Sequence, residues 1–256
     1  MTLRRLLSRV AHKTPEAEAP VFSADCLRIS RSGKSVRLVG PEGLYSYYHP
    51  EHLFTRLGWD AQTASTLLLR RPVRSILILG LGGATVARQC RALYPGADIT
   101  GVEISESVLR MARAHFGLDS LGVCVSVTSG QKYLRIARRP FDVIIDDMWW
   151  PQLNHPKPVH QEPEWAESVR SRLNEGGMYA VNLFSRSAAP HEVEAAVGRL
   201  QKCFTSLREV LPGPPEETSV VAAGSDLCEP REARAKLKRL PGALAIGLRH
   251  VRFLTI

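Results

Sequence analysis

The sequence has no long hydrophobic run and no paired cysteines, and few of its residues are aromatic. None of its apolar stretches approaches the roughly 20 residues that a membrane-spanning helix needs, which excludes a spanning segment. The five cysteines are scattered and never form a Cys-x-x-Cys pair, so neither a metal site nor a disulfide framework is predicted. Because free thiols are typical of a reducing compartment, we expect a cytoplasmic protein.

The charge balance is basic, with 34 Lys and Arg residues against 25 acidic ones and a net charge of +9. An excess of this sign favours an anionic partner such as nucleic acid. The arginines are spread singly or in pairs, however, and no basic stripe with interleaved aromatic residues is visible. We therefore expect a solvated, Arg-rich surface rather than a nucleic-acid interface.

Residues 1–20 predict a basic N-terminal helix followed by a linker. Leu3, Leu6 and Val10 lie at helical spacing among basic residues. Basic residues also interrupt the apolar centre that a secretory signal would need, whereas an Arg-rich, acid-free start is shared with transit peptides. Residues 11–20 have no apolar period and contain proline, which indicates a linker.

Residues 21–70 predict a small N-terminal subdomain of strands and aromatic residues. Segments 26–30 and 35–39 alternate apolar and polar residues on either side of a turn, which predicts a β-hairpin. An aromatic stretch at 44–48 follows. Apolar spacing then predicts a helix over about 60–69.

Residues 71–256 predict a larger α/β domain, because short apolar runs alternate with helical stretches. The predicted strands are 74–79, 98–103, 123–128, 141–147, 177–184, 207–211 and 218–223. The predicted helices are 85–94, 106–116, 130–138, 163–173 and 190–204. The pattern is typical of a Rossmann-like, doubly wound sheet with helices on both faces.

A glycine-rich turn follows the first of these strands and consists of Gly80, Leu81, Gly82 and Gly83. Residues without a Cβ let the backbone turn tightly and approach a ligand, and the N–H groups at a helix start attract polar ligand groups. Glu103 ends the next strand, 20 positions after Gly83, where a carboxylate can accept hydrogen bonds from two ribose hydroxyls. The pair predicts a nucleoside site; the alternative is a structural turn beside a solvated glutamate.

The turn argues against a nicotinamide dinucleotide. A dinucleotide fold normally has a third glycine at Gly-x-Gly-x-x-Gly spacing, but the residue three after Gly82 is Thr85. No second glycine-rich turn follows to bind another half of a dinucleotide.

Four segments resemble the spermidine-synthase family and its methyltransferase-like relatives: ILGLGGAT (78–85), DITGVEISESVLRMARAHFGL (98–118), FDVIIDD (141–147) and LNEGGMYAVNLF (173–184). The resemblance implies the class I methyltransferase type of sheet, a small N-terminal β-hairpin subdomain, an adenosyl cofactor and a homodimer. The implied cofactor-binding residues are Gly80, Leu81, Gly82, Gly83, Glu103, Ile104, Ser129, Gly130, Gln131 and Asp147.

Three positions depart from the aminopropyltransferase pattern of that family. Gly83 and Trp150 replace two of its usual aspartates, and Ser129 replaces the aspartate that receives the adenine amino group. Ser129 can accept that hydrogen bond or simply cap the following helix. The loss of an aspartate at position 83 leaves room for the carboxylate of S-adenosylmethionine. We therefore predict an S-adenosylmethionine-dependent methyltransferase.

The acceptor site is predicted at the end of the fourth parallel strand. Asp147 and Trp150 are the candidates for catalysis, and Asp146 is expected to point to the opposite side. Trp149 and Trp150 form either an aromatic wall for a cationic or planar acceptor, or packing under the next loop. His155 is a candidate base or a solvated side chain. The predicted acceptor-binding residues are Trp149, Trp150, His155, Tyr47 and Asp60.

The acceptor, a small molecule or a protein, is not identified by these residues. Two other functions remain open. The first is a polyamine aminopropyltransferase that uses decarboxylated S-adenosylmethionine. The second is a degenerate member that binds an adenosyl ligand or a protein partner without catalysis.

Overall fold

The structure is a computed structural model that describes residues 26–40, 43–148, 164–183, 190–214 and 218–256. The predicted N-terminal helix and linker lie outside the described residues. So do three of the predicted acceptor-site residues, Trp149, Trp150 and His155.

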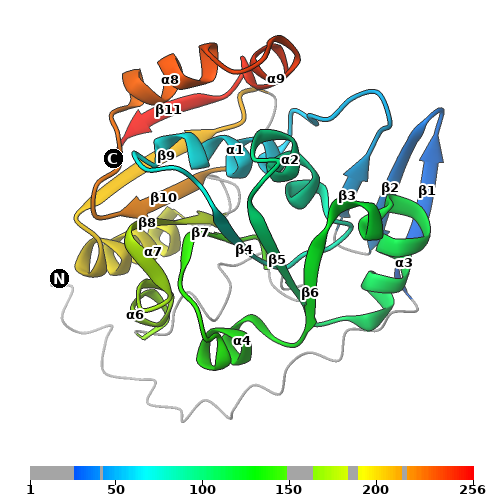
Figure 1. Cartoon of the computed structure of the whole chain (residues 1–256), viewed down its shortest axis with the longest axis horizontal. Coiled ribbons are helices and arrows are strands. Elements are labelled where there is room, and N and C mark those ends of the chain that lie inside the picture. Colours follow the sequence, from blue (N-terminus) through cyan, green and yellow to red (C-terminus); the bar gives the residue numbers. More distant parts are fainter. Residues whose placement is uncertain (1–25, 41–42, 149–163, 184–189, 215–217) are drawn as a thin grey trace, which may run out of the picture.

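A small antiparallel sheet of three strands begins the described chain, in the order β1-β2-β3 (Figure 1). Strands β1 (Arg28–Ser32) and β2 (Ser35–Gly40) form the predicted hairpin around Gly33, which has a φ of +55°. Strand β3 (Gly43–Tyr48) contains the aromatic stretch, which the sequence analysis did not assign to a strand.

The main sheet has eight strands in the order β11-β9-β10-β8-β7-β4-β5-β6. Strands β4 to β8 run parallel, and β10, β9 and β11 add an antiparallel edge. Their bounds are β4 Ser75–Leu79, β5 Asp98–Glu103, β6 Val123–Val127, β7 Phe141–Asp146, β8 Leu173–Asn182, β9 Ser206–Leu211, β10 Val220–Gly224 and β11 Arg252–Thr255. The predicted strands are confirmed to within a few residues.

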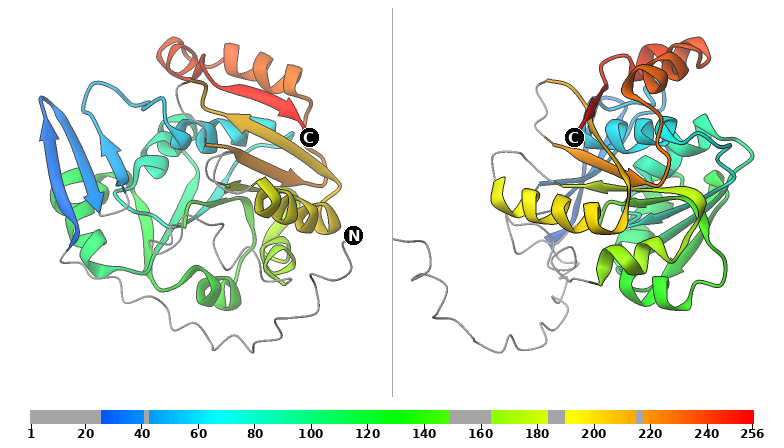
Figure 2. Two further views of the ribbon diagram at one scale, coloured as in Figure 1. Left: turned by 180° about the vertical axis from the view of Figure 1, so that it is seen from behind. Right: turned by 90° about the vertical axis from the view of Figure 1, so that its left-hand side faces the viewer.

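Helices cover both faces of this sheet (Figure 2). Along β4, Ile76 and Ile78 pack into a core with α1, α2 and α8, whereas Leu77 and Leu79 pack into a second core with α4, α6 and α7. The bounds are α1 Gly58–Ser65, α2 Thr85–Leu93, α3 Glu106–Phe116, α4 Gly130–Ile136, α6 Trp165–Arg170, α7 Pro190–Cys203, α8 Pro230–Lys238 and α9 Gly242–Leu248. The predicted doubly wound α/β fold is confirmed. Within the described ranges no helix is both long and apolar enough to cross a bilayer.

Two regions differ from the sequence prediction. No helix or strand was predicted beyond residue 223, yet α8, α9 and edge strand β11 complete the sheet and one of its cores. Helix α1, which the predicted 21–70 subdomain includes, is buried along its whole length and contacts α2 and strands β8 to β10. The proposed division at residue 70 is a prediction that this packing does not test.

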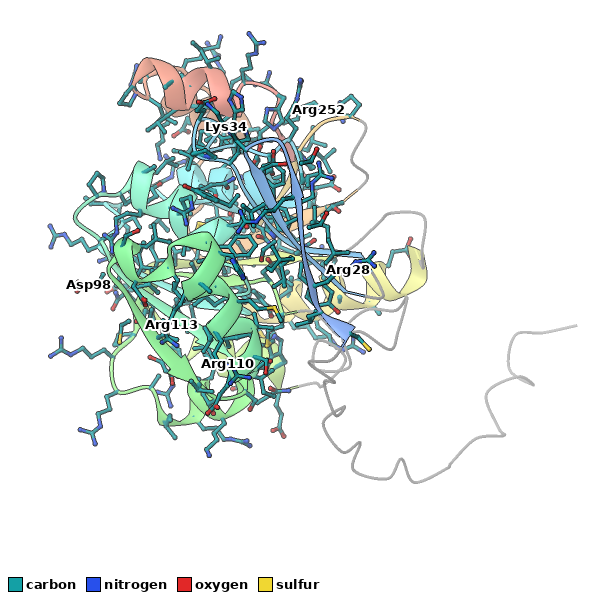
Figure 3. All side chains as sticks on the ribbon, turned by 90° about the vertical axis from the view of Figure 1, so that its right-hand side faces the viewer. Arg28, Lys34, Asp98, Arg110, Arg113 and Arg252 are labelled. Atoms are coloured by element: carbon teal, nitrogen blue, oxygen red, sulfur yellow. The ribbon has the colours of Figure 1, made fainter. Side chains whose placement is uncertain are left out.

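The exposed arginines are distributed over separate elements. Figure 3 labels Arg28 on β1, Arg110 and Arg113 on α3, and Arg252 on β11. The expectation of a solvated, Arg-rich surface rather than a nucleic-acid interface stays a prediction.

The topology fixes where a ligand is expected. The chain winds from β4 to β5 and β6 on one side, and continues through β7 and β8 on the other. Ligands of open α/β sheets bind outside the carboxyl ends of the strands, at this point of reversal. Gly80, Glu103 and Asp147 lie at the carboxyl ends of β4, β5 and β7.

Candidate functional site

The glycine turn after β4 is packed closely against neighbouring strand ends. Gly80 has a φ of +82°, and a Cβ there would lie 2.6 Å from the carbonyl oxygen of Asp147. Only glycine allows this approach. The N–H groups of Gly80 and Leu81 donate to the carbonyl of Val102 at 2.9 and 3.0 Å, which ties the turn to β5.

Two further N–H groups of the turn have protein partners. The Gly82 N–H donates to Oε2 of Glu103 at 3.0 Å, and the Gly83 N–H donates to Oγ of Ser46 at 2.6 Å. Ser46 lies on β3 and is 1% exposed. A Cβ on Gly83 would lie 2.7 Å from the Cβ of Ser46. The small sheet therefore fills the space beside Gly83 that the sequence analysis left for a ligand carboxylate.

Glu103 lies at the predicted position beside the turn. Its Oε1 accepts a hydrogen bond from the Ser105 N–H at 3.0 Å. Burial raises the pKa of Glu103 above its ordinary value; the N–H groups of Gly82 and Ser105 oppose this rise, and the charge of Asp147 adds to it. Ile104, the next residue, is 56% exposed at the same edge of the sheet.

Asp147 is held by three neutral donors from two other elements. The indole Nε1 of Trp59 donates to Oδ2 at 3.0 Å. The amides of Gln62 and Asn182 donate to Oδ1 at 2.7 and 3.2 Å. These hydrogen bonds fix the orientation of the carboxylate.

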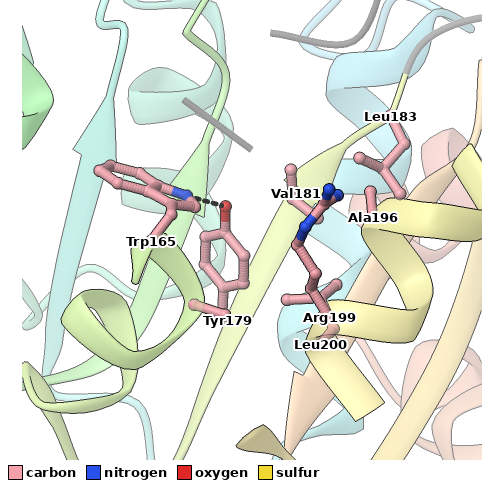
Figure 4. Close-up of a pocket in the computed structure, with 8 residues that line it drawn as sticks. Trp165, Tyr179, Val181, Leu183, Ala196, Arg199 and Leu200 are labelled. Atoms are coloured by element: carbon pink, nitrogen blue, oxygen red, sulfur yellow. Dashed lines mark hydrogen bonds between the residues drawn. The ribbon is translucent and has the colours of Figure 1, made fainter. Parts of the chain in front are cut away.

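Asp146 points to the other side of β7, as predicted. Its carboxylate is fully buried and accepts hydrogen bonds from the Tyr179 hydroxyl at 2.7 Å and the Met148 N–H at 3.2 Å. Figure 4 shows Trp165 donating in turn to that hydroxyl, at 3.1 Å. Burial, together with the charge of Asp146, raises the pKa of Tyr179 well above its usual value. Asp146 therefore supports the core on the face opposite Asp147.

The predicted adenine-binding segment begins α4. The Ser129 Oγ accepts a hydrogen bond from the Lys132 N–H at 3.2 Å and so caps this helix. A Cβ on Gly130 would lie 2.6 Å from the sulfur of Met148, so this glycine allows close packing against the end of β7. Gln131 is partly buried in the first turn. The role of this segment toward adenine stays a prediction.

Two predicted acceptor-site residues are described, and both have protein partners. The backbone N–H and carbonyl of Tyr47 pair with the Thr85 hydroxyl at 3.1 and 3.0 Å, which docks β3 on the start of α2. Asp60 is fully buried. Its carboxylate accepts hydrogen bonds from the Arg56 N–H and the Gln89 amide, both at 2.7 Å. The structure thus places Asp60 as a support for the loop before α1 instead of bringing it to Asp147.

Sequence reasoning missed three residues that contact the site: Ser46, Gln62 and Asn182. Asn182 ends an apolar strand at its carboxyl edge, the same signal that identified Glu103, and that rule would have found it. Ser46 and Gln62 carry no such signal, because the tertiary packing of β3 and α1 alone brings them to the strand ends.

One group of side chains outside this site has metal-ligand chemistry. Among the described residues, the ligand atoms of His49, Glu51 and His52 lie within 4.8 Å of one another. The two imidazole rings stack with centroids 4.4 Å apart, and Glu51 is ion-paired with Lys34. We assign no ion to this group, because the lysine already neutralises its carboxylate.

A doubly wound sheet with a glycine turn after its first parallel strand and an acidic residue ending the second is typical of nucleoside-binding, Rossmann-like folds, to which the class I methyltransferase-like fold belongs. Solved structures agree with this class. A probable spermidine synthase from Corynebacterium glutamicum matches 90% of this chain and 87% of its own, with a TM-score of 0.68 and 17% identity. Human methyltransferase-like protein 13, solved with SAH, matches 75% of this chain and 90% of its own, with a TM-score of 0.60 and 25% identity.

Within that class the sequence is similar to polyamine aminopropyltransferases. A probable polyamine aminopropyl transferase of Bifidobacterium longum is 30% identical over 141 residues, which are 55% of this chain and 31% of the relative. The polyamine aminopropyltransferase of Saccharolobus solfataricus is 24% identical over 168 residues, 63% of this chain and 54% of the relative. The chain thus spans about half, or less, of these relatives. No model of a known protein family matches it. These matches confirm the resemblance to the spermidine-synthase family found in its motifs.

These comparisons correct the main functional prediction. Methyl transfer from S-adenosylmethionine is wrong as the leading interpretation, because the sequence relatives named above are aminopropyltransferases. The physical error was to treat position 83 as open space. Ser46 occupies that space.

Proposed function

We propose that this chain is an aminopropyltransferase of the spermidine-synthase type, with decarboxylated S-adenosylmethionine as donor and an amine as acceptor. The observation that carries the choice of donor is the hydrogen bond from the Gly83 N–H to Ser46 at 2.6 Å. An N–H group that already has a buried partner is not available to a methionine carboxylate. A donor without that carboxylate needs no such group.

Decarboxylated S-adenosylmethionine supplies an electrophilic carbon next to a sulfonium. The lone pair of the acceptor amine forms the new C–N bond while the C–S bond breaks, and the electron pair of that bond stays on sulfur in methylthioadenosine. The amine nitrogen becomes positively charged and must lose one proton. The reaction therefore needs a carboxylate near the attacking nitrogen, both to attract the amine and to accept the proton.

Asp147 is the residue that we assign to this role. It follows β7 at the carboxyl edge of the sheet, and the hydrogen bonds from Trp59, Gln62 and Asn182 hold its oxygens in a fixed orientation. Glu103 is the last residue of β5, which is separated from β7 by β4. We assign its carboxylate to accept hydrogen bonds from the ribose hydroxyls.

The test has a binding step and a chemical step. Purified protein is titrated calorimetrically with decarboxylated S-adenosylmethionine, S-adenosylmethionine and S-adenosylhomocysteine. We expect the first to bind most tightly, because the other two carry a carboxylate. The protein is then incubated with the decarboxylated donor and a diamine, and methylthioadenosine and aminopropylated amine are measured by mass spectrometry.

Equal release of methylthioadenosine with and without protein would end the proposal of catalysis. Binding of none of the three ligands would instead support the degenerate alternative. A cytoplasmic location and a homodimer stay predictions from the sequence and the resemblance.

A further inference from the structure

Helix α9 lies on the surface of the molecule but has no polar face. Helices α8 and α9 form the outermost layer beyond edge strand β11 (Figures 1 and 2). Residues 240–248, which we call the apolar tip, include all of α9 and contain no polar side chain. Ala243 and Ile246 are exposed, and Ile246, at 63%, is the most exposed large apolar side chain of the described residues. A helix that is apolar all round is normally buried, so this one needs an explanation.

The other side of the apolar tip is packed against the protein. Leu248 is 0% exposed and belongs to the core on one face of the main sheet. A Cβ on Gly247 would clash with the ring of Phe54, so this glycine allows α9 to pack closely on the loop before α1. Ala243 and Ile246 are three positions apart and share the helix face opposite Leu248. The fold therefore holds this apolar face at the surface.

Basic residues lie on both sides of the apolar tip in the chain. The exposed ones are Arg234, Lys238 and Arg239 before it, and Arg249 and Arg252 after it. None of these five side chains forms an ion pair with a described residue. From residue 233 to residue 256 the sequence contains no Asp or Glu. A surface with one sign of charge attracts partners of the opposite sign.

The acidic residues just before this stretch do not offset its charge. Glu232 and Asp226 are both paired with Arg70, at 2.7 and 3.0 Å. Glu229 is paired with Arg208. Three carboxylates against two arginines leave one negative charge, compared with the five positive charges around the apolar tip.

The positive charges lie close enough to act on any partner of the apolar tip. Arg239 and Arg249 directly flank it in the chain. Helix α9 has seven residues, which span about 10 Å. Charges at its two ends are therefore within about one screening length of its exposed face at moderate salt. A matching partner combines an apolar interior with a negatively charged surface.

We propose that the apolar tip and its basic flanks dock on the surface of an anionic phospholipid bilayer. In docking of this kind, aliphatic side chains enter the boundary between headgroups and acyl chains, while Lys and Arg lie at the level of the phosphates. Ile246 is the side chain that enters this boundary. The long stems of Arg239 and Arg249 let their charged ends reach the headgroups. The chain then lies on the bilayer without crossing it, and the docking does not depend on the proposed catalysis.

Two other partners fit the same surface less well. Proteins that bind single-stranded nucleic acid combine basic residues with aromatic stacking, but residues 230–252 contain no Phe, Tyr or Trp. A second copy of the chain in a two-fold symmetric dimer would place the same surface against itself. The five positive charges around each apolar tip would then repel those of the other copy.

The first experiment measures co-sedimentation of the full chain with lipid vesicles. Vesicles of phosphatidylcholine alone are compared with vesicles in which half of this lipid is replaced by phosphatidylglycerol. We expect binding to the anionic vesicles only, and a loss of that binding as the salt concentration is raised from about 0.05 to about 0.5 M, because salt screens the attraction. Absence of binding to the anionic vesicles at low salt would overturn the proposal.

The second experiment changes the surface of the protein. Ile246→Ser is expected to weaken vesicle binding about tenfold, because the inserted side chain loses most of its apolar area. Arg239→Gln and Arg249→Gln are each expected to weaken it about fivefold, since one charge near an anionic surface contributes that much.

Ile136→Ser is the matched control. Ile136 is 59% exposed on α4, and the other exposed residues of this helix, Lys132 and Arg135, are charged. Helix α4 thus presents a single isoleucine instead of an apolar segment, and the control is expected to bind vesicles like the wild type. Because all four substituted side chains are exposed, unchanged melting temperatures report correct folding.

The remaining outcomes decide between partners. Vesicle binding that is unchanged in Ile246→Ser and in both glutamine variants overturns the proposal and assigns the binding to another basic segment, such as residues 1–20. An equal loss in Ile136→Ser also overturns it, since any exposed isoleucine would then have the same effect. Self-association without vesicles that Ile246→Ser abolishes assigns the apolar tip to a second copy. Tighter binding to duplex RNA or polyglutamate than to anionic vesicles assigns the basic residues to that partner instead.

Discussion

Asp142 lies near the amino end of β7 and Asp147 directly follows its carboxyl end, and the two carboxylates have different surroundings. At the amino end, Asp142 is 2% exposed and accepts hydrogen bonds from the Arg74 N–H at 2.8 Å, the Ser75 N–H at 3.0 Å and the Asn174 amide at 2.8 Å. At the carboxyl end, side chains of the described residues Trp59, Gln62 and Asn182 donate to Asp147, and the oxygens of the two amides have no partner among the described residues.

The difference between the two ends indicates which carboxylate is structural. Backbone N–H groups of the adjacent strand fix Asp142, so its hydrogen bonds form whenever the sheet forms. Burial raises the pKa of Asp142, but the hydrogen bonds from Arg74, Asn174 and Ser75 outweigh it and lower the pKa overall. Asp147 instead accepts hydrogen bonds from side chains of α1 and β8, so its surroundings depend on how these elements pack and not on the formation of the sheet alone.

The largest expected effect is that of Asp147→Asn. If Asp147 accepts the proton of the attacking amine, this change lowers the rate of aminopropyl transfer by about 10² to 10⁴-fold, the usual contribution of a general base. Asn keeps the size of the side chain, so the affinity for methylthioadenosine changes little. The measurement is steady-state release of methylthioadenosine, and activity within threefold of wild type would remove Asp147 from catalysis.

Asp142→Asn tests the other end of the strand and is the matched control. It weakens a buried, charged hydrogen-bond network, so the free energy of unfolding falls by about 2 to 3 kcal/mol while turnover per folded molecule is retained. Urea denaturation measures the first quantity and active-site titration the second. Unchanged stability would contradict the structural role.

The pH dependence of the free energy of unfolding tests the structural role of Asp142, which distinguishes it from Asp147. Since the pKa of Asp142 is lowered on folding, its contribution is present above the unfolded pKa near 3.8 and is lost as the pH falls through the folded value. Urea titrations at several acidic pH values are expected to show this loss in the wild type and a smaller slope in Asp142→Asn.

Glu103→Ala is expected to weaken binding of methylthioadenosine by about 1.5 to 3 kcal/mol, because the ribose loses a charged hydrogen-bond partner. The substitution also frees the Gly82 N–H, so Glu103→Gln serves as the control that keeps an acceptor there. Calorimetry measures both. An affinity unchanged in the alanine variant would place the ribose elsewhere.

The smallest expected effect is the dependence of ligand affinity on pH through the carboxyl group of Glu103. Ribose hydroxyls donate best to the ionised form of Glu103, and burial raises the pKa of this carboxyl. The affinity for methylthioadenosine is therefore expected to fall as the pH is lowered, starting above the range in which an ordinary glutamate titrates. Glu103→Gln should show a flatter profile, and parallel profiles for the two proteins would assign the dependence to another group.

Much of the fold was predictable because local periodicity and tertiary packing agree. The predicted helix 106–116 coincides with α3, whose Ser105 cap and Gly117 end are visible in the sequence. Strands β4 and β7 were predictable as continuous apolar runs, since both of their faces are buried. Strand β11 was not, because a short edge strand carries little such signal.

The residues of the candidate site also fall into two groups, those that the sequence predicted and those that it did not. Gly80, Glu103 and the opposite orientations of Asp146 and Asp147 follow from strand ends and the two-residue period of a strand. The role expected for Asp60 does not agree with its partners, because nothing in the chain order tells which polar residue of a fully buried helix faces a strand end.

The sequence by itself determined the doubly wound sheet, the glycine turn, and the placement of carboxylates at its carboxyl edge, because local patterns of apolar residues, glycines and strand ends signal them. Only the tertiary structure decided that Ser46 fills the space beside Gly83 and that Gln62 and Asn182 turn their amides toward Asp147. Those contacts join residues 35 to 85 positions apart, and such pairings are set by how whole elements pack rather than by any local pattern.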